Sequence, residues 1–130
     1  MLDTNICIYI AKNKPASVLK KFNSLSVGDV CMSIITYGEL LYGAQKSSLK
    51  AQSLTILDKL IGLIEPIPMP INAAKQYAEL RVKLEKKGLP IGNNDLWIAA
   101  HALAADVILV TNNQREFSRI PDLRVENWIH

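Results

Sequence analysis

Short apolar runs alternate along the chain with segments of helical period. The runs predict strands at residues 1–2, 30–34, 63–67, 107–110 and 123–126. The periodic segments predict helices at residues 5–12, 15–25, 36–46, 48–61, 71–87 and 95–105, with one helical turn at 113–118. Strands that alternate with helices are typical of a parallel sheet with right-handed crossovers. We therefore expect one α/β domain over residues 1–130.

Three of these segments carry additional information. Prolines at positions 66, 68 and 70 restrict the strand at 63–67 to an edge of the sheet or its end. In residues 71–87, apolar side chains at 73, 77, 80 and 84 form one stripe, and Lys75, Glu79 and Lys83 have the spacing of ion pairs outside it. Residues 95–105 are apolar on nearly every side, which predicts a buried helix with Trp97 and His101 packed together in the core.

The composition is that of an ordinary globular domain, with 49% hydrophobic and 21% charged residues in a chain of 130. No apolar stretch reaches the roughly 18 residues that a membrane span needs. Residues 1–3 lack the basic start of a secretory signal, so we expect a cytoplasmic protein without membrane contact. Cys7 and Cys31 have no partner at metal-ligand spacing and are expected to be reduced, buried thiols.

Acidic residues follow the predicted strands. Ligands of parallel sheets bind beyond the carboxyl ends of the strands. Four carboxylates and one amide stand where the chain leaves a strand or approaches the next: Asp3, Glu39, Asp95, Glu116 and Asn112. We therefore expect the carboxylates to converge at one edge of the sheet.

Converging carboxylates repel one another, and each raises the pKa of the others unless a cation compensates. Mg²⁺ or Mn²⁺ is the natural compensating ion, because both take hard oxygen ligands and require neither His nor Cys. Such sites activate water and stabilise a phosphoryl transition state. Hydrolysis of a phosphodiester is therefore the first chemistry to consider.

Each acid also has a purely structural interpretation. Asp3 is placed to cap the helix that follows it, and Thr36 with Glu39 has the spacing of a capping box. Asp95 is placed to complement a helix dipole. Glu116 has arginines beside it with which it can pair. These alternatives remain open from the residues alone.

Four segments together resemble a known family. They are MLDTN at residues 1–5, SIITYGELLYG at 33–43, IGNNDLWIAAHA at 91–102 and VTNNQREF at 110–117. Over almost the whole chain, they resemble the VapC-type PIN-domain ribonuclease toxins of toxin–antitoxin systems. The resemblance implies a PIN-like three-layer sandwich and a metal-dependent endoribonuclease that cuts tRNA or rRNA. It also implies a VapB-type antitoxin and a homodimer within the toxin–antitoxin complex.

The acidic residues of that family fall on Asp3, Glu39, Asp95 and Glu116. Many relatives place an Asp soon after the strand at 107–110, where this chain has asparagines, so its next carboxylate is Glu116. The resemblance implies that Asp3 and Asp95 bind the metal most directly and that Glu39 completes or orients the cluster. Glu116 or Asn112 would hold a second metal or a water.

The charge balance and apolar residues suggest partners. The chain has 15 basic and 12 acidic residues, a net charge of +3, but without the four site acids the balance is 15 to 8, or +7. An acidic site within a basic surround attracts RNA through its phosphates, and we expect recognition largely by shape and backbone.

Tyr37, Leu40 and Leu41 are candidates to dock an antitoxin segment, with a basic side chain of that segment pairing with the acids.

Two other functions compete with this interpretation. A phosphatase or phosphotransfer domain with Asp3 as its nucleophile needs a second acid in an Asp-x-Asp pattern, but that position is Asn5, and no Lys follows the strand at 107–110. A binding module in which the acids only cap helices would have neither metal affinity nor RNA cleavage.

Overall fold

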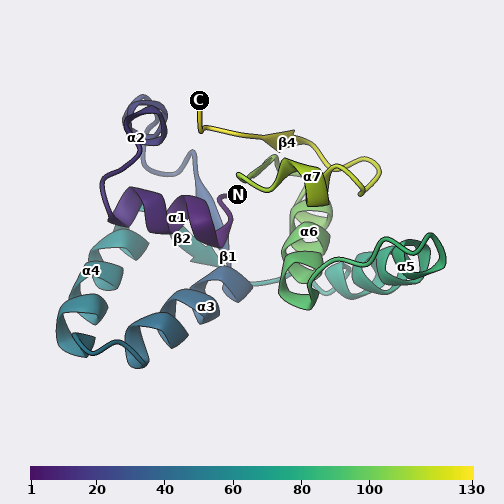
Figure 1. Ribbon diagram of the computed structural model, residues 1–130, viewed down its shortest axis with the longest axis horizontal. Helices are drawn as coiled ribbons and strands as arrows, with labels where there is room; N and C mark the ends of the chain where they lie inside the picture. Colours follow the sequence, from purple (N-terminus) through teal and green to yellow (C-terminus); the bar gives the residue numbers. More distant parts are fainter.

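The computed structural model describes residues 1–130 and contains two pairs of parallel strands (Figure 1). The strands are β1 (Cys31–Ser33), β2 (Glu65–Ile67), β3 (Leu109–Val110) and β4 (Val125–Glu126). β1 pairs with β2, and β3 pairs with β4.

The start of the chain joins these two pairs. The backbone N–H of Leu2 donates to the carbonyl of Cys31 at 2.8 Å, and the N–H of Asp3 donates to the carbonyl of Val110 at 3.0 Å. Leu2 also forms a parallel bridge with Val110. The order across the sheet is therefore β4, β3, the chain start, β1 and β2.

Seven helices surround this sheet: α1 (Thr4–Ala11), α2 (Ala16–Asn23), α3 (Ile34–Gln45), α4 (Lys50–Leu63), α5 (Ala73–Lys86), α6 (Asn93–Ala105) and α7 (Gln114–Phe117). In Figure 1, α1 to α4 occupy one half of the molecule, and α5 to α7 occupy the other. Each predicted helix is present, with ends that differ by a few residues.

The alternation of side chains along the strands separates two hydrophobic cores. Successive residues of a strand point to opposite faces of the sheet. Leu2, Met32 and Val110 belong to a cluster with α1, α2 and α4, whereas Met1, Cys31 and Leu109 pack in a cluster with α5 and α6. The sheet therefore lies between two helical layers, which is the three-layer sandwich expected from the resemblance.

The strands are shorter than predicted because the preceding helices include or hydrogen-bond with residues that were predicted as strand. Val107 and Ile108 precede β3: the N–H of Val107 bonds back to the carbonyl of Ala102 at 3.0 Å and closes α6. Leu63 is the last residue of α4, so β2 begins only at Glu65. Short apolar runs do not distinguish a strand from the last turn of a helix.

The predicted core pair of Trp97 and His101 is wrong. Trp97 stacks instead on Tyr77 of α5, with ring centroids 3.7 Å apart and planes 7° from parallel. His101 is fully buried, and its Nδ1 lies 2.8 Å from the hydroxyl of Ser33. The two side chains therefore have different partners, since Trp97 contacts α5 and His101 contacts β1.

Several smaller predictions can also be compared with the structure. Glu79 pairs with Lys75 at 4.0 Å, but no ion pair joins it to Lys83. Cys7 is buried and Cys31 only partly so, and both are free thiols. No helix combines the length and the apolar character required to cross a membrane.

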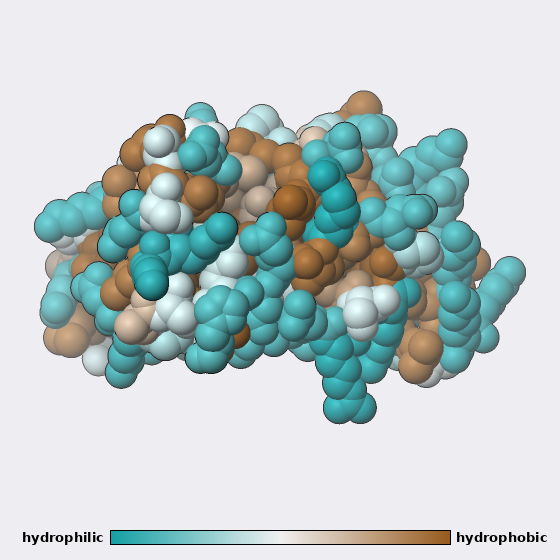
Figure 2. Space-filling view, turned by 90° about the horizontal axis from the view of Figure 1, so that it is seen from above, coloured by the Kyte–Doolittle hydropathy of each residue, from teal (hydrophilic) through white to brown (hydrophobic).

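Figure 2 shows hydrophilic residues gathered over the end of the molecule that α5 forms.

Candidate metal-dependent hydrolytic site

The four predicted acids come from four different parts of the chain. Asp3 directly follows Leu2, in the chain start that lies between β3 and β1, and Glu39 lies in α3, which begins where β1 ends. Asp95 is in the first turn of α6, and Glu116 is in α7, a few residues after β3. The charges of the other three acids all act on Asp95 and raise its pKa, so the structure brings the four carboxylates into one region.

Asp3 is held in a buried position, with 5% of its surface exposed. Its Oδ1 accepts a hydrogen bond from the N–H of Ile6 at 3.0 Å, so it caps α1 as one sequence interpretation proposed. Burial raises the pKa of this carboxyl, and the nearby charge of Glu39 raises it further, while a hydrogen bond from Thr111 acts in the opposite direction. Capping does not account for the hydrogen bond from Thr111 or for the proximity of Glu39, so Asp3 is more than a helix cap.

Glu39 is oriented by residues from two other helices. The hydroxyl of Thr4 donates to its Oε1 at 2.5 Å, and the amide of Asn94 donates to its Oε2 at 3.4 Å. The predicted capping box with Thr36 is wrong, because α3 begins at Ile34 with Ser33 as its cap. Glu39 therefore lies in the second turn of α3, beyond reach of the orphan donors at its start.

Of the four carboxyls, Asp95 has the pKa that its surroundings raise most. Partial burial raises its pKa, and the charges of Glu116, Glu39 and Asp3 raise it further, to about 6. No protein group donates a hydrogen bond to its side chain to offset these effects. A carboxylate in this position is stabilised when a cation binds beside it.

Glu116 reaches back toward the start of α6. Its Oε1 accepts from the N–H of Gly92 at 3.1 Å, and its Oε2 accepts from the amide of Asn113. It forms no ion pair with a neighbouring arginine, so the local-pairing interpretation is wrong. The side-chain oxygen of Asn112 accepts from the amide of Asn127 at 3.3 Å, and no hydrogen bond joins Asn112 to the four acids.

An open hollow of about 410 Å³ lies over the first turn of α6, and no hydrophobic residue lines it. Its lining consists of Glu39, Gly92, Asn93, Asn94 and Asp95. A wider groove of about 500 Å³ begins beside it at Thr4 and Glu39 and runs between α1, α3 and α4. The two acids with raised pKa values and the polar hollow define the candidate site.

The acids interact through their charges without forming a compact ligand cluster. No group of three or more His, Cys, Asp or Glu side chains has an arrangement that would by itself hold a metal ion. Two of the four acids are turned to protein donors, Glu39 to Thr4 and Glu116 to Gly92. Mg²⁺ is commonly bound through one or two carboxylates and several waters, which suits the remaining pair, Asp3 and Asp95.

Sequence reasoning missed the groups that hold these acids in place. They are the hydroxyls of Thr4 and Thr111, the amide of Asn94 and the N–H of Gly92. Thr4 and Asn94 stand directly beside Asp3 and Asp95 in the sequence, and this adjacency was the available signal. The contact from Gly92 to Glu116 spans 24 residues and has no local signature.

Comparison with known proteins shows the family to which the chain belongs. Residues 1–123 match the PIN domain family. The chain therefore belongs to the PIN-domain family, and the predicted PIN-like α/β fold is confirmed.

Particular relatives narrow the resemblance within that family. The tRNA(fMet)-specific endonuclease VapC of Shigella flexneri is 44% identical over 128 residues, which cover 98% of this chain and 96% of that protein. Ribonuclease VapC2 of Rickettsia felis is 46% identical over 129 residues, with the same coverage of both chains. The crystal structure of VapBC2 from Rickettsia felis, bound to a promoter DNA fragment, has a TM-score of 0.91 and covers 99% of this chain and 98% of that chain at 44% identity. The predicted resemblance to VapC ribonucleases is confirmed.

Proposed function

We propose that this protein is a Mg²⁺- or Mn²⁺-dependent endoribonuclease that acts as the toxin of a toxin–antitoxin pair. The observation that carries the proposal is the gathering of acids from separate elements around one polar hollow, which Glu39 and Asp95 line and beside which Glu116 bonds to Gly92. The raised pKa of Asp95, caused by burial and by the charges of the three other acids, supports it. A helix cap or dipole partner alone would not need three further acids around it. The VapC relatives, which are named as ribonucleases, support the same activity.

The donor set fits a hard divalent cation. Asp3 and Asp95 would hold the ion directly, because they are the two acids whose pKa values are raised, so a bound cation stabilises both of them in the charged form. Glu39 and Glu116 would contribute from the surrounding positions, and Asn112 is placed less well because it faces Asn127. When bound, the ion compensates the negative charge of the reacting phosphate and lowers the pKa of water.

Neighbouring residues of this chain hold two of the acids in position for proton transfer. Thr4 and Asn94 each donate a hydrogen bond to one oxygen of Glu39. These two bonds restrict the orientation of its carboxylate at the hollow. The N–H of Gly92 fixes Glu116 in the same way. Two carboxylates so held are suited to orient a water molecule and accept its proton, since positioned general bases act at hydrogen-bonding distance.

The most informative test is RNA cleavage by the purified chain. We expect cleavage with Mg²⁺ or Mn²⁺ and none after EDTA treatment, and sequencing of RNA ends after brief expression in cells identifies the substrate. The tRNA(fMet) specificity of the Shigella flexneri relative makes initiator tRNA the first substrate to examine, followed by rRNA. Undiminished cleavage after thorough chelation would exclude a metal-dependent site.

We further propose that an antitoxin segment occupies the groove beside the site. Ile8, Leu40, Ile56, Leu57 and Leu60 give this groove its apolar lining, and Lys12 lies at its rim. Of the three predicted docking residues, only Leu40 lines the groove. All three also pack against the hydrophobic core. An amphipathic helix suits a groove of this shape, and a basic residue at its end would meet Glu39.

A charge placed in this groove tests the docking. Ile56 is 43% exposed, so Ile56→Glu is expected to abolish co-purification with the product of the neighbouring small gene and to leave RNA cleavage intact. The matched control is Val82→Glu on α5, where the side chain is 52% exposed and lies outside the groove. Equal loss in both variants would contradict docking at this place. The cytoplasm, where RNA and translation are found, is the proposed site of action.

A further inference from the structure

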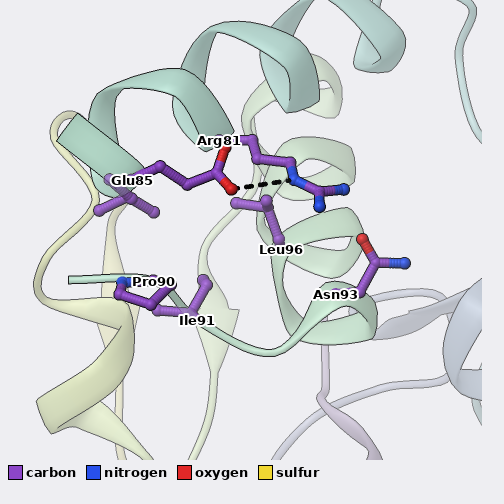
Figure 3. Close-up of a pocket in the computed structure, with 7 residues that line it drawn as sticks. Arg81, Glu85, Pro90, Ile91, Asn93 and Leu96 are labelled. Carbon is purple, nitrogen blue, oxygen red and sulfur yellow. Dashed lines mark ion pairs between the residues drawn. The ribbon is translucent and has the colours of Figure 1, made fainter. Parts of the chain in front are cut away.

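A second, smaller hollow lies between α5 and the start of α6, next to the acidic site (Figure 3). Its volume is about 90 Å³, and its lining consists of Arg81, Leu84, Glu85, Pro90, Ile91, Asn93 and Leu96. None of the four site acids belongs to it. Asn93 lines this hollow and also the polar hollow that contains Glu39 and Asp95, so the two openings are neighbours.

The lining has the chemistry that suits a flat ring with polar edges. Leu84, Pro90, Ile91 and Leu96 supply apolar walls, and Arg81, Glu85 and Asn93 supply hydrogen-bond donors and acceptors. In Figure 3, the guanidinium of Arg81 and the amide of Asn93 lie on the same side of the hollow, opposite Pro90 and Ile91. The volume is far below the roughly 300 Å³ at which sites for drug-sized ligands begin, so it admits a small fragment.

Arg81 is half exposed and contacts two neighbouring side chains of α5. Its Nε lies 3.8 Å from a carboxylate oxygen of Glu85, and its Nη1 donates to the hydroxyl of Tyr77 at 2.7 Å. The ring of Tyr77 is itself stacked on Trp97, and its hydroxyl donates to the side-chain Oδ1 of Asn93. These contacts favour one orientation of the guanidinium, which reduces the conformational entropy that is lost when it binds a ligand.

We propose that this hollow is a base pocket, which receives one unpaired RNA base from a nucleotide close to the scissile phosphate. Single-stranded RNA is recognised through splayed bases that pack on apolar or guanidinium surfaces and hydrogen-bond through their edges. Arg81 and Asn93 read the edge of the base, and the apolar walls hold its faces. The inference rests on the proposed ribonuclease function and assigns Arg81 as a specificity-determining residue.

Arg81→Gln tests the pocket against a closely matched control. Lys75→Gln also removes one cation from an exposed i,i+4 ion pair on α5, yet Lys75 lies outside the pocket. We expect Arg81→Gln to raise KM for a cleavable RNA about tenfold, the effect of one charge-assisted hydrogen bond, and to leave kcat within a factor of about two. Lys75→Gln is expected to leave both nearly unchanged, and thermal unfolding shows that both variants are folded.

A second measurement identifies the base. Each base around the mapped cleavage site is replaced in turn by an abasic nucleotide, and cleavage is compared between wild type and Arg81→Gln. One position is expected to lose about tenfold in the wild type and much less in the variant, because the two changes remove the same interaction. Equal losses at every position in both proteins would overturn the base pocket. If the wild type cleaves no RNA at all, the proposed function itself fails, which is a distinguishable outcome.

Discussion

Replacement of Asp95 by Asn is expected to make the metal-free protein more stable while it abolishes RNA cleavage. Asn has nearly the same shape as Asp and carries no charge. Because no protein group donates a hydrogen bond to the side chain of Asp95, the substitution breaks no such bond. What it removes is the repulsion from Glu116, Glu39 and Asp3 and the cost of partly burying a charge.

The size of this effect follows from the raised pKa. A pKa of about 6 in the folded protein, against the ordinary 3.8, corresponds to about 3 kcal/mol at 1.36 kcal/mol per pKa unit. Solvent screens a side chain that is only partly buried, which reduces the figure to about 1–2 kcal/mol. The variant also loses the favourable interaction of a carboxylate in the first turn of α6 with the helix dipole, which contributes about 0.3–1 kcal/mol. The expected net gain at pH 7 is about 1 kcal/mol.

The gain depends on pH in a defined direction. Because its pKa is higher in the folded than in the unfolded state, the Asp95 carboxyl holds its proton more tightly in the folded protein. Its contribution is therefore most favourable below pH 3.8 and declines as the pH rises through about 6. The advantage of Asp95→Asn over the wild type is expected to be near zero at pH 4 and to develop fully by pH 7.

Thermal unfolding in EDTA, followed by circular dichroism from pH 4 to pH 8, measures this difference. For a chain of this length, 1 kcal/mol corresponds to a shift in Tm of about 3–5 °C. The control is Asp58→Asn, which removes an exposed carboxylate of α4 outside the site. A variant no more stable than the wild type at pH 7, or a difference that is the same at pH 4, would refute the repulsion argument.

Three further outcomes are expected. Asp3→Asn should abolish RNA cleavage and growth arrest, while circular dichroism stays unchanged because Asn also caps helices well; retained toxicity would exclude Asp3 from the site. Chelation with EDTA should stop cleavage without changing the far-ultraviolet spectrum, since backbone hydrogen bonds and two hydrophobic cores hold the helices and strands, and a loss of helix signal would contradict this. Thr4→Val should lower kcat about tenfold with little change in Tm, because it removes the hydroxyl that fixes Glu39 at 2.5 Å, and unchanged kinetics would show that this contact does not position the acid.

The sequence by itself determined the order of strands and helices and the positions at which acidic residues follow the strands. This information is local, because hydrophobic periodicity and the residues beside it record which face of each element is buried. The stripe at 73, 77, 80 and 84 is an example: Ala73, Leu80 and Leu84 are buried in α5 as predicted. Asp3, Glu39, Asp95 and Glu116 were all identified as candidates before their positions in space were known.

Only the tertiary structure decided what each acid contacts. The bond from Thr4 to Glu39 joins residues 35 positions apart, and the bond from Asn94 to Glu39 joins residues 55 positions apart. The start of α3 at Ile34 also changed the role of Glu39, since a shift of two residues moved it out of capping range. Neither the long-range contacts nor the exact helix start is recorded in local periodicity, because both depend on how the layers pack against the sheet. The same packing places Arg81 of α5 beside Asn93 of α6, so the base pocket was invisible in the sequence.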